Sequence, residues 1–205
     1  MPDLTERKTG KGRPVIIAKG FFPIPLPTAQ IAGAYEKQGF RPVVIPLSLK
    51  DKLDVVTYAD TVAATIRREA RSYGGQVDVV GTSMGGVALY YAIKLLDVAS
   101  LVRTAVAAGA PFHGTLYTVP GLAVPVLGRS ARQMAPHSAF LRRLRELPLP
   151  PGPKYISICG TRDWISPWPT TYVEGALNPH WGFKHADLMT FGRTHRRIAL
   201  MLLEE

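Results

Sequence analysis

The sequence is poor in cysteine and contains no long apolar run. Cys159 is the single cysteine among 205 residues, so no internal disulfide can form, and its apolar neighbours favour a small buried thiol. No uninterrupted apolar run approaches the roughly 18 residues that a membrane-spanning helix needs. Internal repeats and low-complexity segments are also absent. These absences favour one globular domain with a substantial core.

The N-terminus lacks the apolar segment of a signal peptide, because its first residues are mostly charged or polar. We therefore expect a cytoplasmic protein, and the sequence leaves open a mature secreted form with a replaced N-terminus. Residues 1–13 are predicted to form a flexible extension, and residues 14–205 to form the domain.

Acidic residues are scarce, with 15 against 25 lysines and arginines, which gives a formal net charge of +10. A basic surface can meet nucleic acid, anionic lipid or acidic substrates. No nucleic-acid motif accompanies the charge, and solvated helix faces explain most such clusters. The plainer interpretation is therefore a soluble basic surface, and an anionic membrane is favoured over nucleic acid as a partner. The clustered arginines are Arg129, Arg132, Arg142, Arg143 and Arg145, with a second group at Arg193, Arg196 and Arg197.

Short apolar runs alternate along the chain with longer segments of helical periodicity. Continuous apolar strands between helices indicate an α/β fold, with a mainly parallel sheet covered by helices on both faces. Residues 111–136 are rich in proline, and residues 170–184 fit a short strand and a loop. Strands are predicted at 14–18, 42–45, 77–80, 101–107 and 154–159, and helices at 28–38, after Asp54 as a cap, after Ser83, at 138–146 and at 186–203.

One five-residue segment carries most of the functional information. Gly81–Gly85 has the sequence Gly-Thr-Ser-Met-Gly and lies between a predicted strand and a predicted helix. This is the pattern of a nucleophile elbow, a sharp turn that holds its serine strained and exposed. Glycines on either side permit such a turn. We therefore predict that Ser83 is a nucleophile, the alternative being an ordinary turn serine.

A serine hydroxyl is a poor nucleophile unless a base accepts its proton and an acid orients that base. In this architecture the acid and then the histidine follow the serine along the chain. Asp163 directly follows the strand at 154–159 and is the predicted acid, the alternative being an Asx-turn residue. His185 is the predicted base, with His180 as the alternative. His195 has the spacing of a packed helix face instead.

Two backbone N–H groups are predicted to form the oxyanion hole. One belongs to Met84, the residue after the nucleophile. The other is expected from the loop after the first strand, at Phe21, because Gly20 lets the backbone turn toward the site.

The chain resembles small bacterial-type lipases and esterases of the α/β-hydrolase fold. The similarity covers residues 14–203 and rests on the segments 81–86, 109–115 and 160–167 and on the residues around His185. It implies hydrolysis of fatty-acid esters through an acyl-enzyme on Ser83, with neither a metal nor an organic cofactor. Those lipases usually carry His-Gly where this chain has Lys19-Gly20, and that histidine generally steadies the oxyanion loop.

The predicted substrate contacts are Phe22, His113 and Trp164. Trp164, like Trp168 and Trp181, either walls an acyl groove or belongs to the core. The chain between residues 107 and 154 is too short for a large lid domain. Residues 116–127 form either a short cap or a buried loop.

We therefore predict a lipase or esterase that acts on small-molecule or lipid esters. An acyltransferase or a thioesterase would use the same triad with a different acceptor, and the sequence leaves both open. A non-catalytic lipid-binding protein on the same fold is less favoured, because the serine, aspartate and histidine are all retained.

Overall fold

The computed structural model describes residues 12–20, 28–116, 128–190 and 192–204. Its strands form a six-stranded sheet in the order β2-β1-β3-β4-β5-β6, and every neighbouring pair is parallel. The predicted parallel sheet is thus confirmed. The strands are β1 (Pro14–Ala18), β2 (Arg41–Val44), β3 (Val77–Thr82), β4 (Val102–Ala108), β5 (Lys154–Gly160) and β6 (His180–Trp181).

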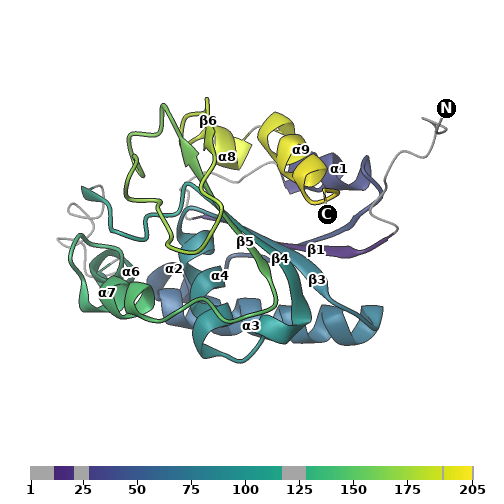
Figure 1. Ribbon diagram of the computed structural model, residues 1–205, viewed down its shortest axis with the longest axis horizontal. Helices are drawn as coiled ribbons and strands as arrows, with labels where there is room; N and C mark the ends of the chain where they lie inside the picture. Colours follow the sequence, from purple (N-terminus) through teal and green to yellow (C-terminus); the bar gives the residue numbers. More distant parts are fainter. Residues whose placement is uncertain (1–11, 21–27, 117–127, 191, 205) are drawn as a thin grey trace.

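Helices cover both faces of the sheet, with α3 and α4 on one side and α1 and α9 on the other (Figure 1). No helix among the described residues is long and apolar enough to cross a membrane. The helices are α1 (Thr28–Glu36), α2 (Leu49–Leu53), α3 (Val55–Tyr73), α4 (Met84–Leu95), α6 (Gly128–Gln133), α7 (Ala139–Glu146), α8 (Asp187–Thr190) and α9 (Gly192–Met201), with a 3₁₀ turn η1 (Ala99–Leu101).

The two helical layers are possible because strand side chains alternate between the faces of the sheet. In β1, Ile16 packs into the cluster formed with α3 and α4, whereas Val15 and Ile17 pack into the cluster formed with α1 and α9. All three side chains are completely buried. A sheet that is apolar on both faces explains why its strands look like continuous apolar runs in the sequence.

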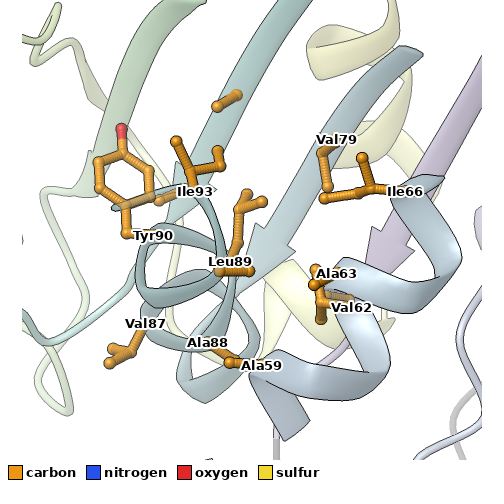
Figure 2. Packing of buried hydrophobic residues seen from close by; sticks show 14 of the residues in the cluster. Ala59, Val62, Ala63, Ile66, Val79, Val87, Ala88, Leu89, Tyr90 and Ile93 are labelled. Atoms are coloured by element: carbon orange, nitrogen blue, oxygen red, sulfur yellow. The ribbon is translucent and has the colours of Figure 1, made fainter. Parts of the chain in front are cut away.

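The helices α3 and α4 pack against each other and against β3 through small and β-branched residues (Figure 2). Ala59 of α3 lies beside Ala88 of α4, and small side chains let the helix axes approach closely. Gly86 brings α4 onto the chain after β4, since a Cβ there would lie only 2.6 Å from the Cβ of Ala110.

Side-chain caps start α2 and α3. Asp54 caps α3 as predicted, because its carboxylate accepts the N–H of Val56 at 3.1 Å. Ser48 and Asp51 form a reciprocal capping box that starts α2. The helix α2 was not predicted, since five residues are too few to show periodicity.

Two further regions differ from the sequence prediction. The proline-rich stretch at 111–136 contains the short helix α6. The last predicted helix is divided into α8 and α9, and Gly192 at the start of α9 is a poor residue for a helix interior. Of the segment 116–127, only Leu116 lies within the described residues, and it is exposed.

The predicted N-terminal extension at 1–13 lies mostly outside the described residues, but Arg13 is anchored. Its guanidinium donates to the carboxylate of Asp78 at 2.7 Å and to the carbonyl of Leu202 at 3.3 Å. Arg103 donates to the same carboxylate at 3.0 Å and to the same carbonyl. Two arginines therefore neutralise a buried aspartate and tie the C-terminus to the sheet.

Candidate active site

Ser83 occupies a strained turn between β3 and α4. Its φ of 52° and ψ of −125° lie outside the regions that most non-glycine residues adopt. Glycines on either side make the turn possible. A Cβ on Gly85 would lie 2.1 Å from the carbonyl oxygen of Ala18, and one on Gly81 would lie 2.5 Å from the Cα of Gly86.

A continuous chain of hydrogen bonds joins Ser83, His185 and Asp163. The Nε2 atom of His185 lies 2.9 Å from the Oγ of Ser83, and its Nδ1 lies 2.7 Å from the Oδ2 of Asp163. A carboxylate oxygen accepts, so Nδ1 carries the ring hydrogen and Nε2 accepts from the serine hydroxyl. The structure thus brings together the three residues that the sequence selected.

Asp163 is fixed by groups that leave only one of its oxygens for the histidine. Its Oδ1 accepts the N–H groups of Ile165 at 2.9 Å and Ser166 at 2.8 Å. Gly109 adjoins the pair with a φ of 58°, and a Cβ there would lie 3.0 Å from the Oδ2 of Asp163. Asp163 and His185 are 3% and 5% exposed, so their contact is largely shielded from water.

The three residues meet because parallel strands end at the same edge of the sheet. Ser83 follows β3, Asp163 follows β5, and His185 lies between β6 and α8. The ring of His180 contacts Trp168 with a centroid distance of 4.6 Å, so the alternative base does not take the position next to Ser83.

The fold of this chain also occurs in proteins of known structure. No protein-family model matches the chain, and no curated protein matches its sequence. Solved structures match over nearly its whole length. The mature form of a lipase from Bacillus licheniformis aligns with a TM-score of 0.77 and 17% identity, over 99% of this chain and 96% of that one.

Aspergillus fumigatus lipase B aligns with a TM-score of 0.74 and 20% identity over 97% of this chain and 54% of that one. An α/β hydrolase enzyme from a lagoon-sediment metagenome aligns with a TM-score of 0.65 and 17% identity, over 95% of this chain and 91% of that one. This chain has the α/β-hydrolase fold. At such identities the likeness concerns the fold, and chemistry must be argued from this chain's own residues.

In an α/β-hydrolase fold the oxyanion hole lies beside the nucleophile. Met84 is the first residue of α4, and its N–H has no acceptor within the helix. The second predicted donor, Phe21, and the predicted contact Phe22 lie outside the described residues. Their roles stay predictions.

The residues on either side of the segment that contains Phe21 are described. The N–H of Gly20 donates to the Oγ1 of Thr82 at 3.1 Å, and the hydroxyl of Tyr58 donates to the carbonyl of Lys19 at 3.0 Å. The Nζ of Lys19 donates to the Oγ1 of Thr28 at 3.2 Å. Partial burial, with the nearby charge of Lys52, lowers the pKa of Lys19. These roles of Thr82 and Tyr58 could not be predicted from the sequence, because both contacts are long-range.

The remaining predicted contacts lie in different surroundings. Trp164 follows Asp163 and is 79% exposed. His113 lines a groove of about 820 Å³ together with Phe112 and Tyr155, and none of Ser83, Asp163 and His185 lines it. Burial, with Arg145 second, lowers the pKa of His113. Substrate contact by Trp164 and His113 also stays a prediction.

His195 packs inside the fold, as the sequence predicted. It is 1% exposed, with its Nε2 2.8 Å from the carbonyl of Leu188 and its Nδ1 2.9 Å from the hydroxyl of Tyr35. Burial lowers its pKa to about 4. Within the described residues, no group of three or more histidine, cysteine, aspartate or glutamate side chains is arranged to hold a metal ion.

Proposed function

We propose that this protein is a serine hydrolase of carboxylic esters, with Ser83 as nucleophile, His185 as base and Asp163 as orienting acid. The observation that carries the proposal is the unbroken hydrogen-bond chain from the Asp163 carboxylate to the Ser83 hydroxyl. The strained elbow supports it, because such backbone strain is characteristic of functional sites.

The first half of the reaction follows from the hydrogen positions. As the Ser83 oxygen attacks the ester carbonyl, its proton passes to Nε2 of His185, and the carbonyl oxygen takes up the negative charge. Asp163 stabilises the resulting imidazolium, and the N–H of Met84 stabilises the oxyanion together with a second donor, which we assign to Phe21. The imidazolium then protonates the leaving alcohol, which departs and leaves an acyl group on Ser83.

Water completes the cycle by the same steps in reverse. His185 removes a proton from water, the hydroxide attacks the acyl carbonyl, and the proton returns to the Ser83 oxygen as the carboxylic acid leaves. Each step transfers a proton or an acyl group, so the oxidation state of every atom is unchanged. The nature of the acceptor distinguishes this hydrolase from an acyltransferase or thioesterase with the same triad.

The direct test combines covalent labelling with turnover. A fluorophosphonate is expected to modify Ser83 in the native protein, and p-nitrophenyl esters from acetate to palmitate are expected to be hydrolysed. Ser83→Ala should abolish the label and lower kcat by roughly 10⁴ to 10⁶, leaving KM nearly unchanged.

Ser72→Ala is the matched control, since Ser72 is an exposed serine at the end of α3. It should keep both the label and the activity. Full hydrolysis by the Ser83→Ala protein would refute the proposal. Labelling without turnover of oxygen esters would direct attention to thioesters and to alcohols as acceptors.

A further inference from the structure

Five exposed basic side chains lie on three neighbouring helices, two of which follow strands of the sheet that contains β3. The helix α2 follows β2 and α6 follows β4, so both begin beyond the strand edge at which Ser83 lies. The helix α6 contacts both α2 and α7, and Figure 1 shows the three grouped at one end of the molecule. Their exposed basic residues are Lys50, Arg129, Arg132, Arg142 and Arg143, which we call the α2/α6/α7 surface.

Acidic residues do not balance this charge, because two of the three acidic side chains in residues 45–54 and 128–147 are buried. Asp51 and Asp54 are 3% and 8% exposed. Asp51 accepts hydrogen bonds from Ser48 and Thr61, and Asp54 accepts from the side chain of Gln133 at 2.6 Å. In residues 45–54 and 128–147, Glu146 is therefore the only exposed acidic residue.

Among the described residues, most of these basic side chains have no ion pair with a carboxylate. Of the five, Arg129 has an ion pair, to Asp54 at 3.3 Å. On the amphipathic helix α7, Leu141 and Leu144 are buried while Arg142 and Arg143 project outward. This arrangement leaves positive charge available for a partner.

Exposed leucines stand in the same region. Leu49 at the start of α2 is 66% exposed, and Leu116 is 73% exposed. Leu116 is held near α6, because the N–H of its neighbour Thr115 donates to the carbonyl of Met134 at 3.1 Å. Apolar side chains among cations suit the boundary between headgroups and acyl chains, where both find favourable surroundings.

We infer that the α2/α6/α7 surface binds anionic lipid bilayers and thereby holds the Ser83 edge of the sheet at the membrane. The contact requires no catalysis, so it is separate from the proposed hydrolysis. The second arginine cluster does not share it: α9 packs on the opposite face of the sheet, and Arg197 lies over the ring of Trp181.

The test measures sedimentation with vesicles of ether-linked lipids, which contain no ester bond. One set contains phosphatidylcholine alone and the other contains phosphatidylserine as well. The native protein should partition strongly to the anionic set at low salt and weakly at about 0.15 M salt, because salt screens the charges. Each basic side chain at such a surface is worth about fivefold in partitioning.

Two variants of identical net charge separate a specific surface from general basicity. The triple reversal Arg132→Glu, Arg142→Glu, Arg143→Glu should lower partitioning by at least about 100-fold. The control reversal Arg71→Glu, Arg193→Glu, Arg196→Glu removes the same charge from exposed positions on α3 and α9, and should lower it less than about tenfold.

Equal losses in the two variants, or equal partitioning of the native protein to both vesicle sets, would overturn the inference. The native protein could instead bind a DNA or RNA duplex more tightly than the anionic vesicles and lose that binding in the first variant. The partner of the surface would then be nucleic acid and not lipid. Hydrolysis of p-nitrophenyl acetate in both variants serves as the folding control. If the native protein hydrolyses no ester yet adsorbs as described, the surface stands and the proposed function fails.

Discussion

His185 and His195 are both buried histidines near the C-terminal end of the chain, and both donate one ring N–H to an oxygen. For His185 the acceptor is the Asp163 carboxylate. For His195 it is the neutral carbonyl of Leu188, and burial lowers the pKa of His195 to about 4. The two rings therefore differ in the oxygen that accepts from them, a carboxylate for His185 and a neutral carbonyl for His195.

The second ring nitrogen also has a different partner in each histidine. Nε2 of His185 faces the Ser83 hydroxyl, whose proton it can accept. Nδ1 of His195 accepts the hydroxyl of Tyr35, and burial raises the pKa of that tyrosine, so its proton stays in place. Burial alone therefore does not indicate a catalytic histidine. A charged acid on one side and a reactive hydroxyl on the other make the difference.

The largest expected effect comes from removing the first histidine. His185→Ala should lower kcat for a p-nitrophenyl ester by roughly 10⁴ to 10⁶, because no other side chain among the described residues is hydrogen-bonded to the Ser83 hydroxyl. The free energy of unfolding should be measured alongside, to show that the variant folds. His180→Ala is the matched control and should retain activity. The reverse result would identify His180 as the base.

The second histidine should affect stability instead, in a pH-dependent way. The folded pKa of His195, about 4, lies below the usual value of about 6.5 expected in the unfolded chain. Between these values the unfolded state binds a proton that the folded state excludes, so stability falls as pH falls. The full effect is about 3 kcal/mol, present above pH ~6.5 and lost by pH ~4.

Urea unfolding at pH 7.5, 6 and 5 measures this dependence. His195→Gln should flatten the decline in the free energy of unfolding, whatever its stability at pH 7.5. His180→Gln, which removes an exposed imidazole, is the control and should keep the native decline. An unchanged slope in His195→Gln would mean that another group accounts for the pH dependence.

Both histidines lie in parts of the fold that could be predicted from the sequence. Ser83 and Asp163 were predictable because each directly follows an apolar strand. His195 was recognisable from its helical spacing. These signals are local, and they were enough for the parallel sheet and for two of the three residues that the structure joins by hydrogen bonds.

Contacts between distant segments could not be predicted from the sequence. The bonds from Gly20 to Thr82 and from Arg13 and Arg103 to Asp78 join segments far apart in the chain. His113 belongs to a segment that resembles lipases, yet its side chain lines a separate groove. Resemblance to a family predicts where a segment lies in the fold. The direction of a side chain depends on the local turn, which here contains Gly114 with a φ of 91°.

A third position, Lys19, carries a lysine where the lipases that this chain resembles usually have a histidine. The bond from Lys19 to Thr28 joins the two ends of the segment that contains the predicted donor Phe21. Loss of one such hydrogen bond typically costs about 1 kcal/mol. If the bond from Lys19 positions an oxyanion donor, its loss should raise the free energy of the transition state and leave substrate binding unchanged.

Lys19→Met should therefore lower kcat by about five- to tenfold at an unchanged KM. It should also weaken a trifluoromethyl ketone inhibitor, whose oxyanion adduct resembles the transition state, by the same factor. Lys19→Arg should restore part of both, because it keeps a cationic donor. Lys50→Met, which removes an exposed lysine on α2, is the control. A change in KM alone would mean that Lys19 acts on substrate entry, and the loop would then be held by Thr82 and Tyr58 without it.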